Sequence, residues 1–206
     1  MRKHGVLKAI VLPALVWLAS TATGTALADD ARPNPPYKNW AAFNVGAAST
    51  LKSVLIDHSN DDPNTIDTTA RPEGASEQLT SYKLTQKTPD KIVIEQTDTD
   101  IEAGSETEHP SVKITYPATV STPKPSNANV SGVKEGEEEI EVAGKPLKVH
   151  WVESTVKIGD ETSSEKLWWT DAVPGGTVKQ VTTKKQGDKV FFERTLTLVS
   201  FKTGNE

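Results

Sequence analysis

Apolar and polar residues alternate along much of the chain, and this alternation predicts β-strands. Residues 112–116 read Val-Lys-Ile-Thr-Tyr, with apolar side chains on one face and polar side chains on the other. Residues 140–142, 147–151 and 190–198 show alternation of the same kind. One apolar face and one polar face are typical of an antiparallel sheet. Val, Ile and Thr, which suit strands, far outnumber Leu after residue 28.

Glycine-containing turns separate these segments and indicate hairpins. Gly144-Lys145 and Gly187-Asp188 are predicted to be hairpin tips. Residues 90–99 are identical to residues 188–197 at five of ten positions. This similarity indicates either an internal duplication or the recurrence of common hairpin chemistry. In both cases we expect the two segments to be the outgoing strands of hairpins.

Helical periodicity is confined to one short segment. Trp40 and Phe43 lie three residues apart, which predicts a short helix over residues 37–43, with Asn39 as its candidate cap. No amphipathic pattern long enough for a helix of three turns follows in the sequence.

The predicted fold class is all-β, with at most short helices. Residues 29–36 are expected to be a flexible lead-in, and the proline-rich residues 117–129 a central loop. Residues 37–206 should form a single domain, because each half alone would be marginally stable. Its sheet is predicted to be large, antiparallel and curved, open or half-closed like half of a barrel. A two-sheet β-sandwich is the alternative.

The first 28 residues have the three parts of a secretory signal peptide. Basic residues come first, an apolar run over residues 9–19 follows, and Ala26-Leu27-Ala28 forms an A-x-A cleavage pattern. The apolar run is too short for a transmembrane helix, which needs about 20 residues. We therefore expect cleavage near Ala28, a mature chain without a transmembrane anchor, and a secreted or periplasmic location. An N-terminal membrane anchor is the alternative.

The amino-acid composition excludes several classes of function. The chain has no cysteine, which excludes disulfides, thiolate zinc sites, iron–sulfur clusters and cysteine nucleophiles. Secreted chains without cysteine are common in the bacterial envelope. Beyond residue 28 the chain has 20 basic and 28 acidic residues, a net charge of −8. This balance argues against nucleic acid as a partner, since binding requires a basic surface.

The sequence contains no catalytic or cofactor-binding motif. A nucleophile elbow, a zinc-protease helix, a Walker loop and a dinucleotide fingerprint are all absent. We therefore predict a protein that is not an enzyme and that has no cofactor. A hydrolase is retained as an alternative, and it would require His58, His109 or His150 to meet a carboxylate and a hydroxyl nucleophile. The acidic residues 135–139 are interpreted as a solvated face that protects an edge strand.

One loop segment is rich in oxygen ligands. Asp57, Asp61, Asp62 and Asp67 are weak candidates for binding calcium. The segment lacks the residue order of an EF-hand, and Asp, Asn and Pro are ordinary loop residues. A solvated loop is the preferred interpretation, so no metal site is predicted.

Aromatic residues are the candidate ligand-binding residues. Trp168 and Trp169 are adjacent in a predicted strand, so their side chains should point to opposite faces of the sheet. Together with Trp40, Tyr82 and Trp151 they are candidates for lining a ligand cavity. The alternative is that these rings fill the core.

Residues 167–179 combine a tryptophan strand, a Pro-Gly-Gly turn and a Val-Lys strand. With the signal peptide, the absence of cysteine and the long antiparallel strands, this pattern resembles uncharacterised bacterial secreted β proteins. More distantly, the chain resembles the half-barrel proteins that carry lipoproteins in the periplasm. That resemblance implies an apolar cavity under a curved sheet that shelters an acyl chain, and it implies no catalytic residues. Low apolar content and the lack of long helices depart from that family.

The preferred hypothesis is a non-enzymatic secreted or periplasmic carrier or binding protein for a hydrophobic small molecule. A continuous apolar cavity that includes Trp168 or Trp169 would favour it. The main alternative is a structural or interaction module of the cell envelope, with an envelope protein as its partner. A filled core with an exposed aromatic patch or a free sheet edge would favour that alternative.

Overall fold

The structure is a computed structural model that describes residues 31–58, 75–121 and 130–204. The predicted signal peptide lies outside the described residues. The elements, in chain order, are β1 (Ala31–Pro33), α1 (Pro35–Ala41), β2 (Ala48–Asp57), β3 (Ser76–Lys87), β4 (Lys91–Glu102), β5 (Ser105–Glu108), β6 (Val112–Pro117), β7 (Thr119–Ser121), β8 (Val130–Val142), β9 (Lys145–Ile158), β10 (Glu161–Trp169), β11 (Thr177–Gln186) and β12 (Lys189–Lys202).

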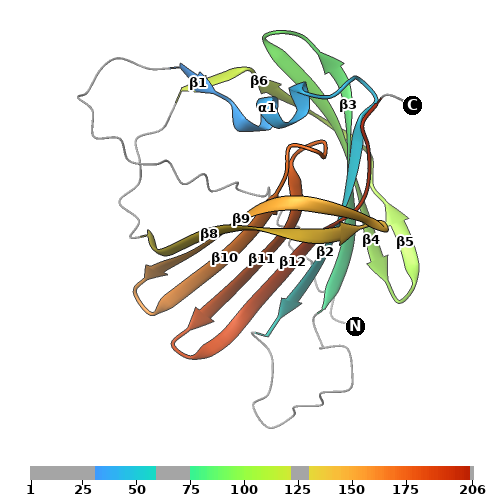
Figure 1. Ribbon diagram of the computed structural model, residues 1–206. Helices are drawn as coiled ribbons and strands as arrows, with labels where there is room; N and C mark the ends of the chain where they lie inside the picture. Colours follow the sequence, from blue (N-terminus) through green and yellow to red (C-terminus); the bar gives the residue numbers. More distant parts are fainter. Residues whose placement is uncertain (1–30, 59–74, 122–129, 205–206) are drawn as a thin grey trace, which may run out of the picture.

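Ten of these strands form one open antiparallel sheet, which confirms the predicted fold class (Figure 1). The strand order is β5-β4-β3-β2-β12-β11-β10-β9-β8, and β6 pairs with β4. The last strand of the chain, β12, pairs with β2 near its beginning. This pairing joins the two halves of the chain in the middle of a single sheet. The sandwich alternative is therefore not observed.

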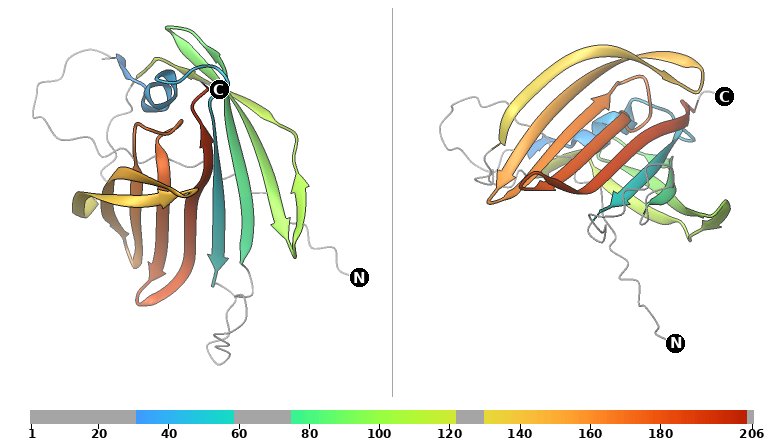
Figure 2. Two further views of the ribbon diagram at one scale, coloured as in Figure 1. Left: turned by 45° about the vertical axis from the view of Figure 1, so that its right-hand side comes forward. Right: turned by 90° about the horizontal axis from the view of Figure 1, so that it is seen from below.

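The sheet curls at the end that contains β8 and β9. Figures 1 and 2 show this hairpin lying across β10, β11 and β12. Val142 and Val149, near the tip of the hairpin, belong to the same core cluster as Leu196 and Leu198 of β12. Register shifts interrupt five of the described strand pairs, and irregularities of this kind increase local twist and bend strands. The curl buries apolar side chains that a flat sheet would expose.

A second core cluster lies beneath α1. The helix packs its buried Trp40 against Leu84 of β3 and against Ile92 and Ile94 of β4. The helix spans Pro35–Ala41, so it begins two residues before the predicted residues 37–43. Two prolines occupy its first positions, where backbone N–H groups have no partner within the helix and their absence costs nothing. The N-cap residue is Asn34 and not the predicted Asn39.

Parts of both segments expected to be irregular pair with each other. β1 pairs with β7, so residues 31–33 and 119–121 form a two-stranded sheet. Asn34 is 6% exposed, and its side-chain amide donates to the Pro117 carbonyl at 2.8 Å. The described part of the expected lead-in is therefore held in place instead of being flexible. Residues 122–129 of the expected loop lie outside the described residues.

The hairpin predictions agree with the structure. β4 and β12, which contain the two similar segments, are each the outgoing strand of a hairpin. The β8–β9 turn lies at Ala143 and Gly144, one residue before the predicted tip. Both residues have positive φ values, 50° and 75°, as two-residue hairpin turns of the primed type require.

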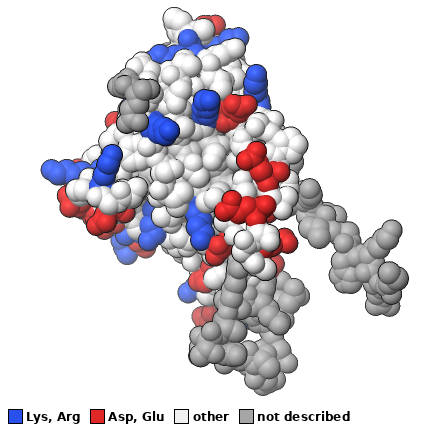
Figure 3. Space-filling model, turned by 90° about the vertical axis from the view of Figure 1, so that its right-hand side faces the viewer, with Lys and Arg blue, Asp and Glu red and all other residues white. Residues whose placement is uncertain are grey.

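Figure 3 shows the side of the molecule that faces right in Figure 1. Acidic side chains lie on the right of this surface and again at its lower left, basic side chains are spread over several parts, and a broad uncharged area lies between them. Both signs of charge are therefore present on this side, and neither covers it. Such a surface favours no single highly charged partner.

Candidate functional site

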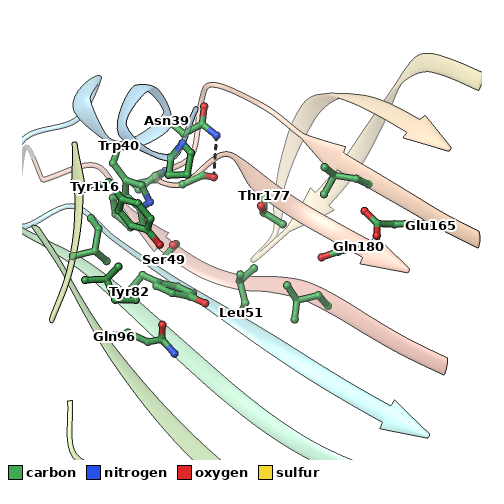
Figure 4. Close-up of a pocket in the computed structure, with 17 residues that line it drawn as sticks. Asn39, Trp40, Ser49, Leu51, Tyr82, Gln96, Tyr116, Glu165, Thr177 and Gln180 are labelled. Atoms are coloured by element: carbon green, nitrogen blue, oxygen red, sulfur yellow. Dashed lines mark hydrogen bonds between the residues drawn. The ribbon is translucent and has the colours of Figure 1, made fainter. Parts of the chain in front are cut away.

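A cavity of about 270 Å³ lies between the sheet, α1 and the turn that follows β10 (Figure 4). Its walls come from β2, β3, β4, β6, β10, β11 and β12 as well as from α1. Because these strands belong to both halves of the chain, the cavity depends on the pairing of β2 with β12. The cavity is the strongest candidate for a functional site.

Strand register explains which side chains reach the cavity. Gln180 of β11 lies between Leu167 of β10 and Leu196 of β12, and all three side chains share one face. In the same way, Ser49 of β2 pairs with Tyr82 of β3. These five residues line the cavity. We call this face of the sheet, which α1 covers, the covered face.

Aromatic rings gather at one end of the cavity. Figure 4 shows Trp40 of α1, Tyr116 of β6 and Tyr82 on the same side. Burial raises the pKa of the Tyr82 phenol to about 12, and the negative charge of Asp98 acts in the same direction. Burial also raises the pKa of Tyr116. Both phenols therefore keep their protons at physiological pH and can donate hydrogen bonds.

The opposite end of the cavity is polar. Glu165 and Gln180 lie there, away from the aromatic rings (Figure 4). Burial raises the pKa of the Glu165 carboxyl, while a hydrogen bond with the Gln180 side chain acts in the opposite direction. Glu165 is the one carboxylate among the described lining residues, and no Lys, Arg or His is among them. The cavity therefore combines an apolar body with a single acidic group.

The turn after β10 closes the cavity against α1. Gly175 has a φ of 83°, and a Cβ atom there would lie 3.1 Å from the Trp40 ring. The Asn39 side chain donates to the Gly175 carbonyl at 3.5 Å (Figure 4). The Pro-Gly-Gly sequence of this turn thus allows a close approach to the helix. Asn39, expected to cap the helix, instead connects it to the turn.

A hydrogen-bonded group of side chains continues the covered face beside the aromatic end. Gln96, which lines the cavity, donates from Nε2 to Asp98 Oδ2 at 3.0 Å. Thr80 Oγ1 donates to Asp98 Oδ1 at 2.8 Å. These contacts hold the Gln96 amide in a defined position next to Tyr82, with which it pairs across the strands. A ligand in the cavity would therefore meet a fixed polar group at this wall.

The structure separates the five aromatic candidates. Trp40 and Tyr82 line the cavity, whereas Trp151, Trp168 and Trp169 are not among its lining residues. The regular pairing of β10 with β9 places Trp168 and Trp169 on opposite faces, as predicted, although the pairing of β10 with β11 is irregular between them. Neither of them lines the cavity, so the cavity lacks the tryptophans that the preferred hypothesis expected there.

The other three tryptophans have contacts of their own. Lys166 Nζ lies 4.1 Å from the centre of the Trp151 ring and 4.6 Å from that of Trp168. The Trp168 indole N–H donates to Glu138 of β8, and the Trp169 ring lies 5.7 Å from that of His150. Trp168 is also buried in the core cluster beneath the β8–β9 hairpin. These contacts show that the three rings pack against other side chains of the sheet and not against the cavity.

Sequence reasoning missed Tyr116, Glu165 and Gln180. A usable signal existed for Glu165, because it lies two residues before Leu167 in a strand-like run and must share its face. Tyr116 reaches the cavity because β6 pairs with β4, although β5 comes between them in the chain. Gln180 lies in the predicted hairpin at Gly187-Asp188, and it meets the opposite wall only because β12 pairs with β2. No local pattern in the sequence indicates these two pairings.

Each histidine of the hydrolase alternative lies close to an acidic side chain. His109 Nε2 is 2.7 Å from Asp100 Oδ2, His150 Nδ1 is 3.2 Å from Glu137 Oε1, and His58 Nε2 is 3.6 Å from Glu193 Oε2. None of the three histidines lines the cavity. The described cavity lining therefore contains hydroxyl groups but no imidazole beside them.

The candidate calcium ligands are mostly outside the described residues. Asp57 is exposed at the end of β2, and Asp61, Asp62 and Asp67 fall in the range that the structure does not describe. Within residues 31–58, 75–121 and 130–204, no three acidic or histidine side chains are grouped so that they could hold a metal ion.

No helix in the described part of the chain is both long and apolar enough to cross a bilayer. Comparisons of the chain with protein-family models, curated protein sequences and solved structures found no match. The interpretation of the cavity therefore depends on its own geometry.

Proposed function

We propose that this protein is a non-enzymatic binding protein and that the cavity beneath α1 is its ligand site. The observation that carries the proposal is the cavity itself, about 270 Å³ in volume. Ligand sites are typically concave and mostly apolar, with a few polar groups that orient the ligand. Trp40, Tyr82 and Leu51 supply apolar walls, and Gln96 and Glu165 supply polar groups.

The size and lining of the cavity favour a small molecule with a substantial apolar part. Contact with the aromatic and aliphatic side chains of the lining removes apolar surface of a bound molecule from water, which favours ligands with an apolar part. The open sheet, with β8 at one edge, is the feature that favours the interaction-module alternative. Secretion or a periplasmic location is proposed on residues 1–28 alone.

The proposal is tested by identifying what the protein carries. The wild-type chain and a Thr177→Phe variant are purified under native conditions and denatured, and the released small molecules are compared by mass spectrometry. Thr177 lines the cavity, so phenylalanine there would fill it. Thr183→Phe is the matched control, because Thr183 pairs with Ser164 on the other face of the sheet.

We expect a compound released by the wild type and by Thr183→Phe at one molecule per chain, and absent from Thr177→Phe. Release of the same compound by all three proteins would contradict the cavity as the binding site. Repeated preparations with no released compound would contradict a tightly bound ligand. That result would favour the alternative function, an interaction module of the cell envelope.

A further inference from the structure

Resting on the proposed function, we propose that the ligand is a small organic amine, bound as a cation with its ammonium group at Glu165 and its apolar body between Trp40, Tyr82 and Tyr116. The inference concerns the chemical class of the ligand. It depends on how charge and aromatic rings are distributed within the cavity.

The charge of the lining favours a cation. Glu165 is the one acidic side chain among the described lining residues, and no basic side chain accompanies it there. A half-buried carboxylate without a cationic partner is less favourable than a solvated one, whereas an ammonium ion beside it would form a charge-assisted hydrogen bond. A bound amine would therefore supply the positive charge that the lining lacks.

The groups facing Glu165 on neighbouring strands do not neutralise it. Register places Thr182 of β11 and Ser154 of β9 next to it, and neither is charged. Lys184, two residues beyond Thr182 on the same face, forms an ion pair with Glu161 at 3.9 Å. Arg194 of β12 lies beyond Thr182 on the same face, and its Nε donates to Ser53 Oγ at 3.1 Å. The Arg194 charge lowers the pKa of the Tyr82 phenol, which offsets a small part of the increase caused by burial. Burial meanwhile raises the pKa of Glu165, as expected for a carboxyl without a cationic partner.

The aromatic end suits the other part of such a ligand. Figure 4 shows Trp40, Tyr82 and Tyr116 on one side of the cavity, Glu165 and Gln180 on the other, and Leu51 between them. Aromatic rings bind apolar and aromatic groups through their faces and edges. A fatty acid whose carboxylate lay at the polar end would be disfavoured, because it would meet the Glu165 carboxylate there.

Three probes of the same shape test the charge preference. Phenethylamine is a cation at pH 7.5, 2-phenylethanol is its neutral analogue, and 3-phenylpropanoate is an anion of similar size. Their dissociation constants are measured by NMR titration of the wild type, Glu165→Gln and Glu161→Gln. Glu161 is an exposed residue of the same strand and does not line the cavity, so it is the matched control.

We expect the wild type and Glu161→Gln to bind the amine about tenfold or more tightly than the alcohol, with the anion weakest. Glu165→Gln should lose the preference for the amine while its affinity for the alcohol changes by less than about threefold. Thr177→Phe should abolish binding of the amine.

Two results would overturn the inference and can be told apart from failure of the proposed function. Equal or tighter binding of the alcohol or the anion, blocked by Thr177→Phe, would reject the amine and retain the cavity as a ligand site. Absence of binding by all three probes would reject this ligand class. If no compound is released from the purified protein either, the binding function is rejected as well.

Discussion

Glu165 combines partial burial with a charge that nothing in the cavity lining neutralises. A leucine-like residue at this position would be easier to bury, so the carboxyl group is unfavourable for folding alone. Groups that reduce stability while they line a cavity are typical of functional sites. At the scale of single residues, Glu165 is therefore the strongest functional candidate.

This interpretation predicts how Glu165→Gln changes stability with pH. Because the pKa of Glu165 is raised in the folded chain, the unfolded chain loses this proton first, and stability falls as pH rises from the ordinary value of 4.5 to the raised pKa. Glu165→Gln should therefore be more stable than the wild type at pH 7, with a smaller difference at pH 4. Urea unfolding at both pH values measures this difference in the free energy of unfolding, with Glu161→Gln as the control. An unchanged difference at the two pH values would contradict the prediction.

Gly136 is required by the packing of Trp151. A Cβ atom at Gly136 would lie 2.7 Å from the Trp151 ring, and the Lys166 ammonium group lies 4.1 Å from the centre of the same ring. Gly136→Ala should therefore lower the free energy of unfolding by about 1 kcal/mol or more. In a Trp151→Ala background the same change should be neutral or stabilising, since alanine restricts the unfolded chain. Equal effects in the two backgrounds would rule out the steric explanation.

At the scale of elements, α1 covers the cavity and is fastened at its C-terminal end. Lys87 Nζ donates to the Ala41 carbonyl at 2.7 Å and to the Phe43 carbonyl at 2.8 Å. A cation at this end of a helix is favourable because the last carbonyls lack partners within the helix. The contact links the position of the helix to β3.

Loss of this contact should loosen the helix. We expect Lys87→Met to lower the free energy of unfolding by about 1 kcal/mol and to speed hydrogen exchange within Pro35–Ala41. Lys83→Met changes another exposed lysine of β3 and is the control. Faster exchange spread evenly over the whole sheet, or none at all, would show that Lys87 does not hold α1.

β8 is the outer strand at one end of the sheet, and it contains the acidic residues 135–139. Charged side chains on an edge strand oppose pairing with other molecules. Glu135→Val together with Glu139→Val should therefore promote self-association at neutral pH, as measured by light scattering. Glu153→Val with Glu161→Val removes the same charge from β9 and β10, which have partners on both sides. Equal association of the two double variants would contradict a protective role for β8.

Strands and hairpins were predictable from the sequence because alternation and turn residues are local signals. The β1–β7 pair was not predictable, since residues 31–33 and 119–121 are too short to show a clear alternating pattern and Pro33 is unusual in a strand. The start of α1 was misplaced because the prediction followed the spacing of Trp40 and Phe43 instead of the prolines at positions 35 and 36. Local patterns thus locate elements better than they locate boundaries and partners.

For the molecule as a whole, the decisive feature is the pairing of β2 with β12. It places Leu51 and Leu196, which are far apart in the sequence, in one cavity wall. Alternation predicts an inward face for each strand but not the order of the strands, so an open curved sheet could be expected without its cavity being located. Trp40 and Tyr82 were found as large aromatic residues, whereas Tyr116 required the pairing of β6 with β4, and the position of Gln180 opposite Tyr82 required the pairing of β12 with β2.

The central claim is that ligand binds beneath α1, and it is tested most directly by NMR of the tryptophan indoles. After removal of residues 1–28 the chain has four tryptophans, of which Trp40 lines the cavity and Trp151, Trp168 and Trp169 do not. During titration with phenethylamine, we predict that the Trp40 indole signal and the Gln180 side-chain amide signals shift together. Shifts confined to the indole signals of Trp168 or Trp169 would contradict the account and place binding elsewhere on the sheet.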